Sequence, residues 1–317
     1  MTKVNPRSLT GKVDNYIIEN IITQLSANHV LIDTGWVTSD DPAIKQLDHT
    51  KTAVCYSGID WENTGCIPER LNAHEVIKNN SKSQIHIGNS NGKYYFSYWV
   101  EFIRQNPTYF FDQAFTKTPI IEKLFLSYNR KPHPHRKFLL KQFDNYNLTN
   151  LGIISRPDLP IGDLTFYNPS QLDHYGAEVK AKFPNDIFSL GDSVLWNKFL
   201  INVVTETTIH TNVFLSEKTW KPIIGLRPFL ILGDNNLYIH LQELGFDTFD
   251  DVFGTWWELP RWQYRAQAIA DILKKFDANP ATLNSLYQKL LPRLLNNRKR
   301  FEEYTIENHN KILNLGI

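Results

Sequence analysis

The sequence lacks the glycine-rich signatures of several common enzyme classes. Its 317 residues contain no G-x-G-x-x-G and no G-x-x-x-x-G-K-[ST] segment. These patterns mark dinucleotide sites and phosphate loops, because each chemistry needs a backbone that approaches its ligand closely. Dinucleotide redox chemistry and P-loop hydrolysis are therefore disfavoured.

Cysteine is scarce, and long apolar runs are missing. Cys55 and Cys66 are the two cysteines, and without a nearby His cluster they favour buried thiols over a zinc site, a bridge or a disulfide framework. No window approaches the roughly 18 apolar residues of a membrane span, and the N-terminus lacks the apolar segment of a signal peptide. We therefore expect a cytoplasmic protein.

Neither charge sign dominates the chain. The formal net charge is +1 and 42% of the residues are hydrophobic, which is enough for two ordinary cores. Such a balance neither drives nor forbids binding to a polyanion, so a nucleic-acid role would require a local basic face. A C-terminal cluster around Arg298 and Arg300 is followed at once by acids, and we expect a solvated helix face there.

Apolar runs of strand length alternate with segments of helical periodicity, which predicts parallel sheets. In the N-terminal part, strands are expected at 29–33, 52–58 and 84–88, and helices at 67–80 and from 94 to just before Pro107. Further on, strands are expected at 123–130, 151–156, 199–207 and 228–233, and helices at 134–146, 216–226 and 236–246. From Glu258 onward only helices are expected.

This alternation predicts an α/β protein with two Rossmann-like domains facing a cleft. We expect an N-terminal domain over 1–118, a second domain over 119–257 and C-terminal helices over 258–317 that pack across both. Ligands of such sheets bind at the carboxyl ends of the strands. The segments that follow those strands are therefore the candidate site.

Ser216, Glu217 and Lys218 begin the predicted helix 216–226 directly after such a strand. A helix start offers unpaired N–H groups and partial positive charge to a phosphate, while Glu217 could accept hydrogen bonds from a ribose diol. Glu206 ends the preceding strand and should return to the same rim. A plain N-cap serine followed by a first-turn acid would give the same sequence, and that alternative stays open.

A second candidate is the basic segment that follows the strand at 123–130. Arginine offers a planar fork to diphosphate oxygens and lysine a mobile charge, so the segment is typical of a phosphate-binding loop, with a basic surface turn as the alternative. No Asp-x-Asp stands at a strand end to hold a divalent ion, and a metal site at His133 and His135 would lack a third ligand nearby in the sequence. We expect no metal and no cofactor. The candidate residues here are Asn129, Arg130, Lys131, His135 and Arg136.

The segments "FLSEKTWKPIIGLRPFLILG", "LQELGFDTFDD" and "FLSYNRKPHPHRKFLL" together resemble fucosyltransferase-like glycosyltransferases, especially the short relatives of phage genomes. The resemblance spans roughly residues 123–254. It implies a GT-B architecture, a nucleoside-diphosphate sugar as donor, no metal and inversion at the anomeric carbon. It assigns the ribose to Glu217, the diphosphate to Lys218, and the charge of the leaving group to Arg130 with Arg136.

The acceptor side is expected across the cleft, in the segment 56–65. Asp60 or Glu62 would be the general base, and Trp61 could stack on an acceptor ring, although a polar turn with one packed Trp fits equally. The acceptor would be a glycan or, given the phage-like resemblance, a hydroxymethylated base in viral DNA. The alternative is a non-catalytic nucleotide- or sugar-binding protein, and the oligomeric state is open.

Overall fold

The predicted alternation of strands and helices is present in the computed structural model, which describes residues 9–33, 42–57, 75–88, 94–111, 119–129, 132–155, 190, 193–209 and 213–317. The chain forms two units, one of Met1–Gln105 with Tyr304–Ile317 and one of Asn106–Glu303. Each unit contains a parallel sheet. The α/β class and the parallel strands are therefore confirmed.

The first unit carries its strands in the simple order β1-β2-β3-β4, and all three pairs are parallel. In the inner strand β2 the four residues from Ala53 to Tyr56 are buried, as expected for a parallel strand covered on both faces. Residues 75–80 are helical. The elements are α1 (Leu9–Ile22), β1 (His29–Asp33), α2 (Pro42–Lys45), β2 (Thr52–Ser57), β3 (Ser83–Gly88), β4 (Tyr94–Tyr95) and α4 (Tyr98–Gln105).

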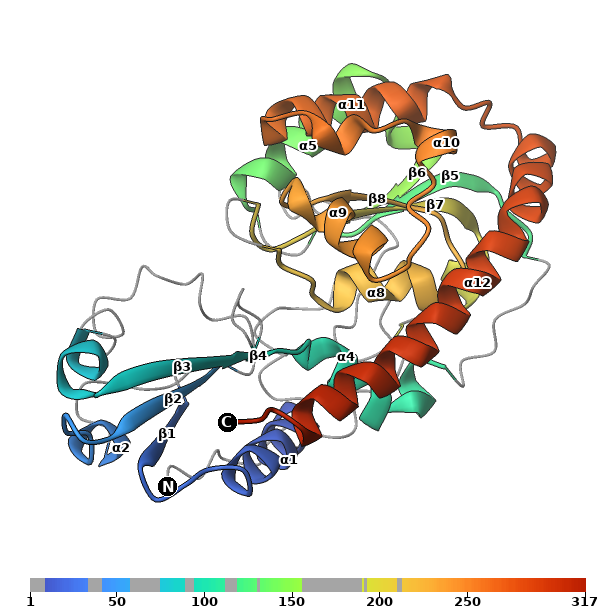
Figure 1. Ribbon diagram of the computed structural model, residues 1–317. Helices are drawn as coiled ribbons and strands as arrows, with labels where there is room; N and C mark the ends of the chain where they lie inside the picture. The colour runs from blue at the N-terminus through green and yellow to red at the C-terminus, as the bar shows by residue number, and fades with distance from the viewer. Residues whose placement is uncertain are drawn as a thin grey trace. The chain divides into compact units, whose positions relative to one another are not determined.

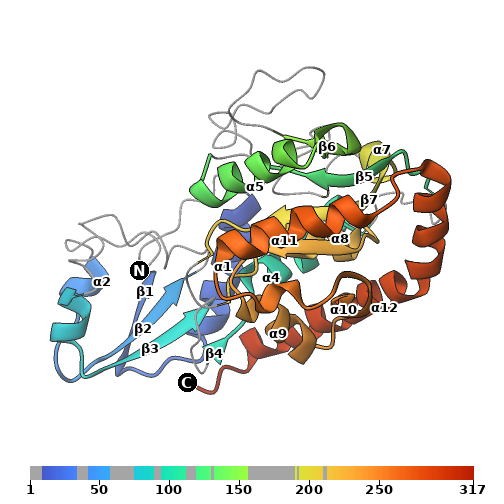
Figure 2. The ribbon, with the colours of Figure 1, turned by 90° about the horizontal axis from the view of Figure 1, so that it is seen from above.

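The second unit has the strand order β6-β5-β7-β8, again all parallel. Every residue of β7 and β8 is buried. Helices α5 and α11 cover one face of this sheet, and α8 and α9 cover the other (Figures 1 and 2). The elements are η2 (Pro107–Tyr109), β5 (Lys123–Ser127), α5 (Pro134–Asn145), η3 (Thr149–Leu151), β6 (Gly152–Ile154), α7 (Ser193–Trp196), β7 (Phe199–Thr205), α8 (Glu217–Ile224), β8 (Phe229–Leu232), α9 (Asn236–Glu243), α10 (Asp250–Phe253), η4 (Trp256–Glu258) and α11 (Trp262–Lys275).

The order of the second sheet contains a switch point. From β5 the chain goes outward to β6 and then crosses back to β7 on the other side of β5. At such a point the two connections leave in opposite directions, which opens a crevice at the carboxyl ends of the strands. The strands that flank this point are β5 and β7.

The C-terminal helix α12 (Pro280–Leu313) contributes to both units, because the division between them falls at Tyr304. In the second unit Trp220 of α8 packs against Phe301, with ring centroids 5.2 Å apart. In the first unit the side chain of Asn308 in α12 forms two hydrogen bonds with the backbone of Ser97. It accepts from the N–H at 2.6 Å and donates to the carbonyl oxygen at 3.0 Å. The segment 258–317 is thus helical as predicted, and its last turns belong with the N-terminal residues.

Candidate functional site

The end of β5 is tied to its neighbours by Asn129, which is fully buried. Its side-chain NH₂ group donates to Ser127 Oγ at 3.2 Å, and its side-chain oxygen Oδ1 accepts from Thr205 Oγ1 at 2.9 Å. The backbone N–H of Asn129 donates to Ser155 Oγ, beyond β6. Asn129 therefore links the carboxyl ends of three strands, and its predicted role in donor binding stays a prediction.

The predicted phosphate position at the start of α8 is occupied by the carboxylate of Glu206. This fully buried group accepts from the N–H of Ser216 at 3.1 Å, from its hydroxyl at 2.6 Å and from Thr219 Oγ1 at 2.6 Å. A carboxylate at a helix start is stabilised by the unpaired donors and the helix dipole. Glu206 and Ser216 lie together as the sequence predicted, and their contacts hold α8 onto the end of β7.

Glu217 and Lys218 form an ion pair in which Nζ lies 2.9 Å from Oε1. The carboxylate is buried, with 3% of its side chain exposed, whereas 29% of the Lys218 side chain is exposed. The ammonium also donates to Ser216 Oγ at 3.2 Å. Lys218 is therefore the member of the predicted triplet with the greater access to a ligand.

The described part of the basic loop is directed toward the end of β7. The ring Nε2 of His135 lies 2.9 Å from the carbonyl oxygen of Glu206, and Arg136 donates to the carbonyl of Thr205 at 3.1 Å. Both side chains are buried. These contacts anchor α5 to β7, while the predicted phosphate-binding residues Arg130 and Lys131 lie outside the described residues.

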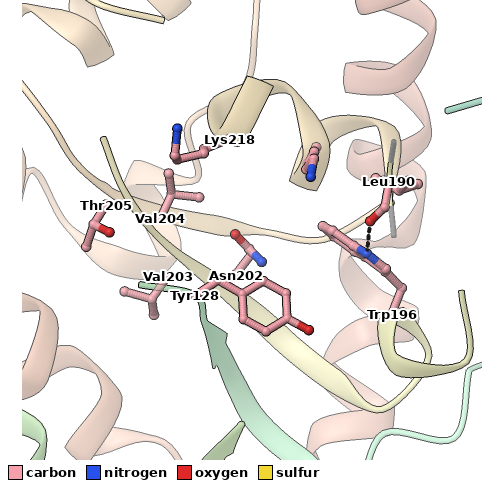
Figure 3. Close-up of a pocket in the computed structure, with 9 residues that line it drawn as sticks. Tyr128, Leu190, Trp196, Asn202, Val203, Val204, Thr205 and Lys218 are labelled. Carbon is pink, nitrogen blue, oxygen red and sulfur yellow. Dashed lines mark hydrogen bonds between the residues drawn. The ribbon is translucent and has the colours of Figure 1, made fainter. Parts of the chain in front are cut away.

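An open pocket lies beside β7 in the second unit, and Figure 3 shows the side chains that surround it. Its empty space, the opening included, is about 420 Å³. Strand β7 provides one wall, and α8 brings in two lysines. The described lining residues are Tyr128, Leu190, Trp196, Asn202, Val203, Val204, Thr205, Lys218 and Lys221.

Of these described lining residues, the sequence prediction named Lys218 as a site residue, and the polar or aromatic ones that it missed include Tyr128, Trp196, Asn202 and Lys221. Asn202 had a detectable signal, because it is the amide in the otherwise apolar run "FLINVV" of a strand expected to be buried. Lys221 follows Lys218 by one helical turn and so shares its face. No local pattern connected Trp196 with the lysines of α8, since that proximity depends on the tertiary fold.

The wall at Trp196 is fixed by hydrogen bonds. Its indole N–H donates to the carbonyl of Leu190 at 2.7 Å, and its own carbonyl accepts from the guanidinium of Arg227. Arg227 is 1% exposed, and burial lowers its pKa to about 10. It therefore stays charged at neutral pH, and it also donates to the carbonyl of Leu226 at 2.7 Å.

The expected acceptor-side residues Asp60, Trp61 and Glu62 lie outside the described residues. Across the part of the chain that the structure describes, no group of three His, Cys, Asp or Glu side chains is arranged to hold a metal ion. None of the helices in the described ranges is both long and apolar enough to cross a membrane.

Comparison with known proteins adds no family to this picture. No protein-family model, no curated protein and no solved structure matches the chain. The functional argument therefore rests on the sheet topology and on the pocket.

Proposed function

We propose that the chain is a glycosyltransferase that moves a sugar from a nucleoside-diphosphate sugar to an acceptor hydroxyl, with the donor held in the second unit. The observation that carries the proposal is the pocket beside the switch-point strand β7. Among the described residues that line this pocket, Lys218 and Lys221 are the charged ones. Ligands of open parallel sheets bind at such points, and two ammonium groups favour a diphosphate. The sequence resemblance to fucosyltransferase-like enzymes supports the same donor class and a GT-B arrangement.

In the proposed reaction the acceptor oxygen attacks the anomeric carbon, and the bond from that carbon to the diphosphate breaks. The bonding electrons leave with the nucleoside diphosphate, and the acceptor proton passes to a carboxylate, for which Asp60 and Glu62 are the proposed candidates. Lysine charge beside the leaving group would stabilise the transition state, where negative charge grows on the diphosphate. Inversion and independence from metal are part of the proposal.

The proposal is tested by measuring release of nucleoside diphosphate from a panel of nucleotide sugars without added metal. Each donor is incubated alone, with candidate glycans, and with duplex DNA that contains hydroxymethylated bases. We expect one donor to give release that rises with one acceptor class. Lys218→Gln should lower kcat/KM by about 100-fold, as when one donor to a developing anion is removed.

Lys289→Gln is the matched control, since Lys289 lies exposed on α12 of the same unit and should leave the rate unchanged. Binding of a nucleotide without release under any acceptor would replace the transferase proposal with the non-catalytic binding protein. Absence of both binding and release would remove both functions.

A further inference from the structure

Asn202 is a polar residue in the middle of an apolar, wholly buried strand. It is the fourth of the seven residues of β7, and 8% of its surface is exposed. Its backbone takes part in the sheet, where its N–H donates to the carbonyl of Pro228 at 2.9 Å. A central strand position of this kind is normally apolar, because a buried amide without partners costs about 1–3 kcal/mol.

The side-chain amide of Asn202 has no hydrogen-bond partner among the described residues, in contrast to Asn129 and Asn308, whose side chains are bonded. Instead it lines the pocket, where Figure 3 shows it between Lys218 and the ring of Tyr128. A primary amide offers two donor hydrogens and an acceptor oxygen. The pocket therefore contains both a donor and an acceptor at its β7 wall.

The charge of the pocket comes from the neighbouring helix. Lys218 and Lys221 are one turn apart on α8, and the other described lining residues are neutral. The carboxylate of Glu217 neutralises part of this charge through its pair with Lys218, and Glu206 is enclosed by hydroxyl and N–H donors. The resulting surface favours an anion at the α8 side and a neutral polar group at the β7 side.

We infer that this pocket takes a sugar phosphate, with Lys218 and Lys221 contacting the phosphate oxygens and Asn202 recognising an adjacent sugar hydroxyl. A hydroxyl is both donor and acceptor, which matches the amide, and the apolar side chains of Val204 and Leu190 flank the carbon skeleton. The inference rests on the proposed function, since it names the part of the donor that the pocket holds. Asn202 is thereby a specificity-determining residue.

Two parts of a nucleoside-diphosphate sugar contain this chemistry: the ribose phosphate and the phosphate that carries the transferred sugar. The test is a thermal-shift titration with four probes, namely inorganic pyrophosphate, ribose 5-phosphate, a panel of hexose 1-phosphates and a panel of nucleoside diphosphates. A ligand that binds the folded state raises Tm in proportion to the logarithm of its concentration over Kd. The ribose and hexose arms identify which end of the donor the pocket holds.

Wild type is compared with Asn202→Leu, Asn202→Ala and the control Asn296→Leu, whose asparagine is exposed on α12. Without ligand, Asn202→Leu should fold with a stability close to that of wild type, because the amide it removes has no hydrogen-bond partner among the described residues. With ligand, both Asn202 variants should bind the sugar phosphate at least 10-fold more weakly and pyrophosphate less than about 3-fold more weakly. Asn202→Ala serves if the leucine variant does not fold.

Equal affinity of wild type and both Asn202 variants for the sugar phosphates would overturn the inference, as would a wild type that binds none of them. Binding that depends on Asn202, together with no turnover of any nucleotide sugar, would keep the inference and remove the proposed transferase. Turnover of a donor at a rate that does not change in the Asn202 variants would overturn the inference and keep the proposed transferase.

Discussion

Glu206 and Glu217 are both buried carboxylates near the start of α8, yet their surroundings give them different roles. Glu206 accepts three hydrogen bonds from Ser216 and Thr219. Glu217 forms its ion pair with Lys218. The sequence placed both acids at one rim but could not assign their partners, because the partners depend on how α8 meets the end of β7.

Glu206→Gln tests the capping role of this carboxylate. The substitution replaces one acceptor oxygen with an NH₂ group that faces another donor, so one or more of the three hydrogen bonds is lost. We expect the free energy of unfolding to fall by about 1–3 kcal/mol in urea titrations. Glu258→Gln, at an exposed position, should leave it within about 0.5 kcal/mol of wild type. Equal stability of the two variants would show that Glu206 does not hold the helix.

At the residue scale the sequence predicted which residues gather near the start of α8, but it did not predict which groups they bond. The pair of Glu217 with Lys218 and the proximity of Ser216 to Glu206 agree with the expected cluster. His135 and Arg136 also lie at the end of β7, but their side chains bond backbone carbonyls there. Asn202 and Lys221 were missed because they lie in the middle of a strand and a helix, whereas the sequence pattern marks residues that follow the ends of strands.

The elements themselves follow from periodicity and burial. The four strands of the second sheet and helix α8 lie within the predicted segments, since long apolar runs and a capped helix are strong local signals. Helix α1 was not predicted. Its stretch contains Gly11 and several β-branched isoleucines, which lower helix propensity. Its position is instead supported by packing, for example of Tyr16 on His309 of α12.

The segment from Asp247 to Asp251, part of the family resemblance, is held by α12. Arg293 donates to Asp247 and Asp251, at 2.8 and 2.7 Å from Nη2, and its guanidinium lies 5.0 Å from the ring centroid of Phe249. Phe249 has a left-handed backbone, with φ of 61°. The side chain of Asn297, also in α12, accepts from the backbone N–H of Asp247 and donates to its carbonyl oxygen. These contacts explain how a strained turn is kept at the start of α10.

Arg293→Gln should reduce the acid sensitivity of the fold. The hydrogen bond from Arg293 lowers the pKa of Asp251 in the folded state. The contact therefore stabilises the fold above the ordinary aspartate pKa, and its contribution is lost as the pH falls through the folded value. We expect the variant to lose about 1 kcal/mol at pH 7 and to lose less further stability than wild type between pH 5 and pH 3.

Urea unfolding at pH 7, 5, 4 and 3 measures this difference, with Lys289→Gln as the control for removing a positive charge from α12. Parallel pH profiles for wild type and Arg293→Gln would mean that the ion pairs do not contribute to acid unfolding.

At the scale of the molecule, the two sheets differ in a way that matters for function. The first sheet runs β1 to β4 in simple order, whereas the second reverses between β5 and β7. The sequence predicted two parallel sheets, since strands and helices alternate twice. It could not predict their strand orders, because the pairing of β5 with β7 joins segments separated by an entire helix and strand.

The division of the chain also depends on tertiary contacts. Helix α12 is continuous past Pro292 and ends among residues of the first unit, where Gln24 donates to the carbonyl of Ile312 at 2.9 Å. Helical periodicity predicted that the C-terminal residues form helices. Assigning its last turns to the N-terminal unit required the contacts of side chains such as Asn308.

The central claim is that the second unit holds a nucleoside diphosphate through Lys218 and Lys221. Calorimetric titration of a panel of nucleoside diphosphates into wild type, the Lys218→Gln/Lys221→Gln double variant and Lys289→Gln tests it most directly. The account predicts that one nucleotide binds wild type and the control alike, and that the double variant binds it at least 10-fold more weakly, since two charged hydrogen bonds are lost. Equal affinity in the double variant, or no binding by a wild-type protein that unfolds cooperatively, would contradict it.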